Sequence, residues 1–183
     1  MRPWGIWLAA TLVLAAAIHD AAVRATPAVV NFVWLTTLDW NGLKSNDLVH
    51  AMKPKPQGRD VVGYDNPDNV SSFIIYDVSE APLRVRARVV REAPYWSLSF
   101  VDYETDVFAL IRDKDVEGDV VTIVLAREGA DYQAQEGERV VTAPTDKGVV
   151  LFRMIVPDRM DLATVQQLAA IKAESTAEVV SAP

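Results

Sequence analysis

The sequence contains no cysteine and only two histidines among its 183 residues. Without cysteine the chain cannot form disulfides, thiolate zinc sites, iron–sulfur clusters or a thiol nucleophile. His19 and His50 stand far apart and no third ligand accompanies them, so we expect no histidine-based metal site. No Gly-x-Ser-x-Gly segment surrounds Ser71 and Ser72, which argues against a serine hydrolase. The sequence therefore predicts no metal and no cofactor.

Basic residues are also scarce. The chain has 18 Lys+Arg against 25 Asp+Glu, a formal net charge of −7. Nucleic-acid binding needs a positively charged surface that neutralises phosphates, so we expect no nucleic-acid partner. Hydrophobic residues make up 50% of the chain, which is too many for a chain that is disordered throughout.

The hydrophobic residues are concentrated at the N-terminus, where they make up 27 of the first 40. No charge occurs from Trp4 to Ile18, and a helix over residues 3–22 would be about 30 Å long, the thickness of the hydrocarbon core. Trp4 and Trp7 suit an interface, and Arg2 favours a cytoplasmic N-terminus. We therefore predict a membrane anchor or signal-anchor helix over residues 1–24.

Two other interpretations of this segment remain open. Arg2, the apolar run Trp4–Leu14 and the small residues Ala15–Ala17 also form the three regions of a cleaved signal peptide. A buried helix of a soluble protein is the third possibility. The first two interpretations agree that the rest of the chain is exported.

A second apolar stretch over residues 25–40 predicts a juxtamembrane helix whose apolar side chains point in all directions. Such a helix packs on its own domain, rests on the membrane surface, or pairs with a partner protein. For a partner, Phe32, Trp34 and Trp40 are the expected anchors.

The remainder of the chain predicts a linker over residues 41–68, a β domain with a C-terminal helix over residues 69–175, and a flexible tail over residues 176–183. Short runs with period two, separated by turn-forming residues, are typical of an all-β domain. The expected strands are Val70–Val78, Pro82–Val90, Trp96–Tyr103, Val107–Arg112, Val120–Ala126, Glu138–Thr142 and Gly148–Val156.

Two of these segments, Val120–Leu125 and Val149–Phe152, are apolar on both faces and should lie in the middle of a sheet. After Pro157, Asp161 is the expected N-cap of a helix that runs to about Glu174. The predicted fold is mainly β: an antiparallel β-sandwich, jelly-roll or Ig-like, with an N-terminal transmembrane helix before it and a C-terminal helix that closes it.

Charged side chains in the strands provide the candidate binding sites. Alternation places Leu83, Val85 and Ala87 on one face of a strand. The cationic stripe of Arg84, Arg86 and Arg88 then lies on the other face. The stripe could bind an anion or a partner, or it could pair with acidic residues of neighbouring strands.

Asp77 and Arg153 interrupt otherwise apolar strands, and together with Asp106 they are our candidates for binding a small molecule. The segment Asp102–Asp106 carries three carboxylates. It is either a calcium-binding segment or a solvated strand end and turn.

The order and spacing of several short motifs resemble the family known as domain of unknown function 1254, over roughly residues 18–172. The motifs are Asn66-Pro67-Asp68, Tyr76-Asp77-Val78-Ser79 with Pro82, Tyr95-Trp96-Ser97-Leu98-Ser99, Thr105-Asp106 with Phe108, and Pro144 with Gly148–Leu151, preceded by His19, Val23, Pro27 and Val30. In particular, the chain resembles the short bacterial members that begin with one membrane segment, and this resemblance implies an exported β-rich domain. With the orientation that Arg2 favours, we expect a single-pass protein of the bacterial inner membrane whose C-terminal domain lies in the periplasm. In longer relatives domain of unknown function 1214 follows, which implies a partner protein carrying that domain here.

From the residues and the resemblance together we expect a membrane-anchored, periplasm-facing binding or assembly module that contacts the lipid bilayer and a partner chain, rather than an enzyme. The alternative is an envelope module that binds or modifies a small molecule or carbohydrate.

Overall fold

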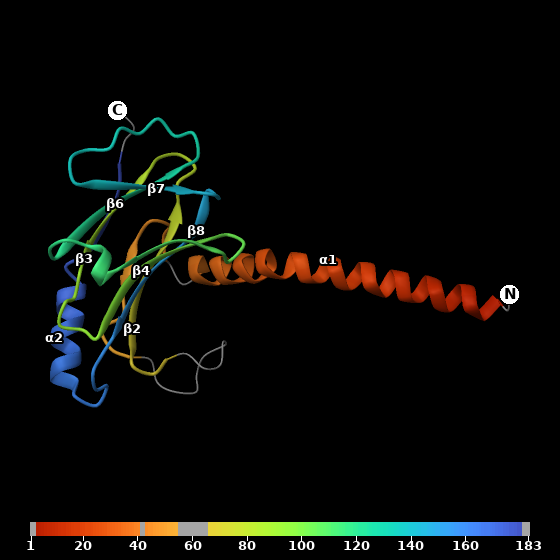
Figure 1. Cartoon of the computed structure of the whole chain (residues 1–183), viewed down its shortest axis with the longest axis horizontal. Coiled ribbons are helices and arrows are strands. Elements are labelled where there is room, and N and C mark those ends of the chain that lie inside the picture. Colours follow the sequence, from red (N-terminus) through yellow and green to blue (C-terminus); the bar gives the residue numbers. More distant parts are fainter. Residues whose placement is uncertain (1–2, 41–42, 55–65, 181–183) are drawn as a thin grey trace.

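The computed structural model describes residues 3–40, 43–54 and 66–180. Within the first range, the side chains at positions 34, 35 and 37–40 lie outside this description. Figure 1 shows a β domain from which one long helix extends, with the N-terminus at the far end of that helix.

The two apolar N-terminal segments form one continuous helix, α1 (Pro3–Trp40), rather than an anchor followed by a second helix. Pro27 lies inside α1 and has no N–H to bond the carbonyl of Val23. One residue earlier, the hydroxyl of Thr26 donates to the carbonyl of Ala22 at 2.7 Å. The helix continues through this position because a proline removes only one bond of the ladder. With 38 residues, α1 is about 57 Å long.

Nine strands form two sheets within the described residues, and all seven expected strands are among them, with ends within two residues of the expected ones. The five-stranded sheet has the order β1-β2-β8-β4-β5, and all its neighbours are antiparallel. Its strands are β1 (Leu48–His50), β2 (Asn69–Asp77), β8 (Lys147–Ile155), β4 (Tyr95–Asp102) and β5 (Val107–Arg112).

The four-stranded sheet has the order β7-β6-β3-β9 and is mixed, since β6 and β7 run parallel. Its strands are β7 (Glu138–Ala143), β6 (Val120–Arg127), β3 (Leu83–Arg88) and β9 (Thr176–Val179). The expectation of purely antiparallel sheets is therefore wrong at one pair. Residues 128–137 lead the chain from the last residue of β6 back toward its first residues. β7 therefore starts at the same edge of the sheet as β6 and runs in the same direction.

Two segments expected to be irregular contain strands. β1 lies in the expected linker over residues 41–68 and pairs with β2, while residues 55–65 of that linker lie outside the described residues. β9 lies in the expected tail over residues 176–183 and pairs with β3, while residues 181–183 lie outside the described residues. Both strands are too short to show a convincing alternation, and only their partners define them.

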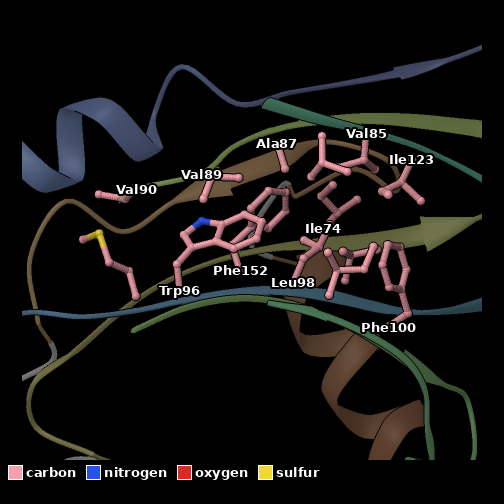
Figure 2. Packing of buried hydrophobic residues seen from close by; sticks show 14 of the residues in the cluster. Ile74, Val85, Ala87, Val89, Val90, Trp96, Leu98, Phe100, Ile123 and Phe152 are labelled. Carbon is pink, nitrogen blue, oxygen red and sulfur yellow. The ribbon is translucent and has the colours of Figure 1, made fainter. Parts of the chain in front are cut away.

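One hydrophobic core lies between the two sheets. Figure 2 shows Val85, Ala87 and Ile123 from the four-stranded sheet opposite Trp96, Leu98, Phe100, Ile74 and Phe152 from the five-stranded sheet. The two segments that are apolar on both faces belong to β6 and β8, and both strands lie inside their sheets as predicted. β8 lies between β2 and β4, and β6 lies between β3 and β7.

A second helix, α2 (Leu162–Lys172), follows β8 after a short connection. Asp161 is its N-cap, as predicted, and accepts a hydrogen bond from the backbone N–H of Thr164 at 3.1 Å. The apolar side of α2 includes Val165, Leu168 and Ala169, which belong to the core. α2 therefore adds its apolar side to the core of the β domain.

Candidate functional site

The exposed side chains of α1 are the most unusual surface of the molecule. From Trp4 to Val33 the helix is long and apolar enough to cross a membrane, and none of that window is buried. Trp4, Trp7 and Val13 are exposed by 83%, 74% and 70%. Soluble proteins rarely expose contiguous apolar surface on this scale, and such a surface is typical of a membrane segment, a signal sequence or a protein-binding site.

The polar groups of α1 are few, and two of them pair within the helix. Arg24 forms an ion pair with Asp20, one turn earlier, with Nε and Oδ2 2.8 Å apart. Toward the domain, the side-chain amide of Asn31 donates to the backbone carbonyl of Tyr103 in the turn after β4. This bond joins α1 to the β domain.

Of the three expected partner anchors, Phe32 is 63% exposed. Trp34 and Trp40 lie on α1, but their side chains are outside the described part of the chain.

The predicted cationic stripe lies on the outer face of the four-stranded sheet and is largely neutralised. Arg84 binds two carboxylates: its Nε lies 2.7 Å from Glu138 Oε1 and its Nη1 lies 2.8 Å from Glu178 Oε1. A hydrogen bond from the backbone N–H of Gln135, with others from Tyr132 and Arg84, lowers the pKa of Glu138. The expectation that neighbouring strands pair with the stripe is confirmed for Arg84.

The other two arginines of the stripe differ in their partners. Nη1 of Arg88 lies 3.4 Å from Oδ2 of Asp119, and its Nε lies 3.3 Å from Oε2 of Glu174. Arg86 is exposed, and no described acidic residue forms an ion pair with it. Among the three arginines of the stripe, Arg86 is therefore the one that remains available to an outside anion.

The three residues expected to bind a small molecule do not converge. Asp77 ends β2, where its Oδ2 lies 3.1 Å from Nζ of Lys147. Arg153 is exposed and pairs in register with Ser71, six residues before Asp77 on β2, which corresponds to about 20 Å. Asp106 follows β4, on the other side of β8 from Asp77.

Asp77 instead stabilises the end of its strand. Its Oδ1 accepts hydrogen bonds from the backbone N–H and the hydroxyl of Ser79, at 3.1 and 2.6 Å. Partial burial raises the pKa of Asp77, but the bonds from Ser79 and then Lys147 outweigh burial and lower it.

The acidic segment Asp102–Asp106 forms a turn. Asp102 Oδ1 accepts the backbone N–H groups of Glu104 and Asp106, both at 2.9 Å, and Thr105 has a φ of 74°. No group of three His, Asp or Glu side chains among the described residues is arranged to hold a metal ion. The carboxylate of Asp102, which is only 9% exposed, therefore satisfies the backbone of this turn, while Glu104 and Asp106 are exposed to solvent.

The structure brings together a buried polar cluster that the sequence did not reveal: His50, Ser72 and Lys172. His50 on β1 lies directly opposite Ser72 on β2, and His50 Nδ1 is 3.0 Å from Ser72 Oγ. Lys172, at the end of α2, donates through Nζ to the carbonyl of Ala51 at 2.9 Å and to that of Val70 at 3.4 Å.

The side chains of Ser72 and Lys172 are fully buried. Burial lowers the pKa of Lys172 to about 8. Burial, and then the charge of Lys172, also lowers the pKa of His50. No carboxylate forms an ion pair with Lys172 in the described parts of the chain. This cluster can connect β1 and α2 to β2, and its contribution to stability depends on pH.

One feature of the sequence could have drawn attention to Lys172, although it does not identify the cluster. Lys172 stands seven residues after Val165 and three after Ala169, so it continues the apolar side of α2. A lysine at such a position is either buried or extends past the apolar surface to water. The sequence does not distinguish the two, because the outcome depends on the carbonyls of β1 and β2.

Comparison with known proteins places these observations in context. A family model described as "Protein of unknown function (DUF1254)" matches residues 45–174. No curated protein matches the chain.

Several solved structures are similar to the chain, among them the following two. One is the VPA0106 protein from Vibrio parahaemolyticus, with a TM-score of 0.69 and 14% identity over 89% of this chain and 38% of that one. The other is an uncharacterized protein from Burkholderia cenocepacia, with a TM-score of 0.43 and 20% identity over 70% of this chain and 42% of that one. The chain thus spans less than half the length of each, and the Vibrio protein shares its fold.

Proposed function

The chain belongs to the DUF1254 family of proteins of unknown function, and from this premise we propose that it is a membrane-anchored β domain that acts as a binding or assembly module. The observation that carries the proposal is the apolar window from Trp4 to Val33, of which no part is buried. A helix is suited to this environment because it satisfies its own backbone hydrogen bonds in lipid.

The proposed orientation puts the N-terminus in the cytoplasm and the β domain in the periplasm of a bacterium. Arg2 is the only charged side chain before the apolar run, and positive charge favours the cytoplasmic side. The signal-peptide alternative predicts the same compartment but removes the first part of α1. The mass of the mature protein distinguishes the two.

We propose a two-layer sandwich for the β domain, in which the outer face of the four-stranded sheet carries exposed charged side chains that can make contacts. The shared core and the facing side chains in Figure 2 support two layers. The parallel pair β6–β7 is a departure from both Ig-like and jelly-roll sheets.

We also propose a protein partner, such as a chain with domain of unknown function 1214. In the Vibrio protein the matched region is 38% of the chain, so this fold occurs there together with further protein. Exposed Arg86 gives the four-stranded sheet a free cation for an acidic group of such a partner.

The test is extraction of the full chain from its native membranes. We expect the protein to resist alkaline carbonate and to dissolve in detergent at the mass of the uncleaved chain. A variant with Leu8→Lys and Leu12→Lys should appear in the soluble fraction, whereas Ala134→Lys and Glu136→Lys in the domain should change nothing. Release of the native chain by carbonate would refute the anchor.

Partner binding is measured on the detergent-solubilised chain by its mass in solution. A complex larger than the chain, lost in Arg86→Glu and retained in Arg139→Glu, would support the assembly role. A monomer under all mild extraction conditions would refute it.

A further inference from the structure

We infer that the turn between β4 and β5, residues 103–107, contacts the lipid headgroups, so that the β domain rests directly on the membrane surface. The inference depends on the proposed membrane anchor. Beyond the anchor, it identifies which surface of the β domain faces the lipid. The inference is argued from the length of α1 and from the contact made by Asn31.

The first step is that α1 runs without a break from the apolar run to Asn31, whose side chain contacts the domain. The helix is continuous from Pro3 to Trp40, and Pro27 does not interrupt it. In Figure 1 the helix extends straight from the domain. The depth of the helix in a bilayer therefore determines the height of the domain above it.

The second step is the point where helix and domain meet. The amide of Asn31 donates to the carbonyl of Tyr103, which places the β4–β5 turn beside this position of the helix. The large apolar side chains of α1 are well exposed on both sides of Asn31, as Val30 and Phe32 show with 55% and 63%.

The third step compares the helix with the bilayer. From Pro3 to Asn31 the helix rises about 42 Å, and a bilayer with its headgroups is about 40–45 Å thick. If the hydrocarbon begins at Trp4 or Trp7, about 20 residues bring it to an end at Arg24 or Pro27.

The ion pair of Asp20 and Arg24 supports this placement. The two side chains neutralise each other at 2.8 Å, and a long arginine side chain can reach the headgroups from just inside the hydrocarbon. From Arg24 or Pro27 to Asn31 the helix rises about 6–10 Å, close to the thickness of one headgroup layer. Tyr103 therefore lies at the outer limit of the headgroups.

The chemistry of the turn restricts the lipid. Glu104 and Asp106 are exposed carboxylates, and Val107 next to them is 59% exposed. Carboxylates are repelled by an anionic surface and attracted by the ammonium group of a zwitterionic headgroup. The turn therefore fits a surface of zwitterionic lipid.

The chain has no cysteine, so single labelled cysteines can report depth in nanodiscs of zwitterionic lipid. Ala10→Cys reports insertion, Glu104→Cys reports the turn, and Gln166→Cys on α2 is the control. In Figure 1, α2 lies on the opposite side of the domain from the free end of α1.

We expect acyl-chain quenchers to reach the label at position 10, and headgroup quenchers to reach the label at 104 at least about twofold more than the label at 166. Anionic lipid should reduce the quenching at 104. If the label at position 10 is quenched while the labels at 104 and 166 are equally unquenched, the membrane anchor is supported and the inference is wrong. If position 10 is not quenched, the anchor itself fails and the inference fails with it.

Discussion

Lys172 gives the sharpest energetic prediction, because its buried ammonium has no carboxylate partner among the described residues. Its pKa is lowered from 10.5 to about 8 by burial. As the pH falls, the unfolded chain takes up this proton first, near 10.5, and the folded chain only near 8. Stability is therefore full above the unfolded pKa and is lost as the pH falls toward the folded pKa.

The size of the effect follows from the shift. At pH 7 the charged Lys172 costs about 3 kcal/mol relative to its neutral form, and most of that cost is gone by pH 10. We compare the wild type with Lys172→Met, which has a similar shape but no charge. Between pH 7 and pH 10 the free energy of unfolding of the wild type should rise by about 2–3 kcal/mol relative to this variant.

The assay is urea unfolding of the full chain in detergent, followed by circular dichroism at several pH values. Other titrating groups cancel in the difference between the two proteins. Loss of the hydrogen bonds to Ala51 and Val70 changes the free energy of unfolding of Lys172→Met by the same amount at every pH. It therefore does not affect how the difference between the two proteins changes with pH. Lys114→Met, at an exposed position, is the control and should give no slope. Parallel curves for the wild type and Lys172→Met would refute a buried ammonium.

Three further predictions use the same unfolding assay. Burial, and then the charge of Lys172, lowers the pKa of His50. The wild type should therefore lose stability relative to His50→Gln as the pH falls below about 6.5. A difference in the free energy of unfolding that stays constant down to pH 5 would contradict this. Arg84→Gln should cost about 1–3 kcal/mol because it leaves a nearly buried carboxylate without its cation, whereas Arg86→Gln should stay within about 0.5 kcal/mol; equal effects would refute the assignment. Gly148→Ala should prevent normal folding, because its Cβ would clash with the carbonyl oxygen of Val101, and a stable variant would show that β8 can move.

The strands were predictable because each carries its own signal. In β3 the alternation of Leu83, Val85 and Ala87 with arginines identifies both faces, and the structure confirms that the first three are buried. The two-sided apolar segments likewise identify β6 and β8 as internal strands. Burial on one face or two follows from local residue order, and no distant partner is needed to detect it.

The pairing of side chains was not predictable in the same way. Arg84 finds its carboxylates 54 and 94 residues later, on β7 and β9. His50 meets Ser72 only because a three-residue strand pairs at one register with β2. These contacts depend on sheet order, and the parallel placement of β7 departs from the simple antiparallel expectation.

The unbroken helix α1 has the largest consequence for function, and it shows why a sequence pattern can locate a helix without fixing its extent. The sequence predicts one helix over residues 1–24 and another over residues 25–40. The structure joins them, because Pro27 removes only one backbone bond and the charges of Asp20 and Arg24 neutralise each other. A broken helix would leave the domain on a tether, at no fixed height above the bilayer. A continuous helix, joined to the domain by Asn31, fixes that height. In the arrangement that we propose, the side of the β domain that carries Tyr103 faces the lipid, and the exposed Arg86 on the four-stranded sheet is the group that we propose for contact with a partner.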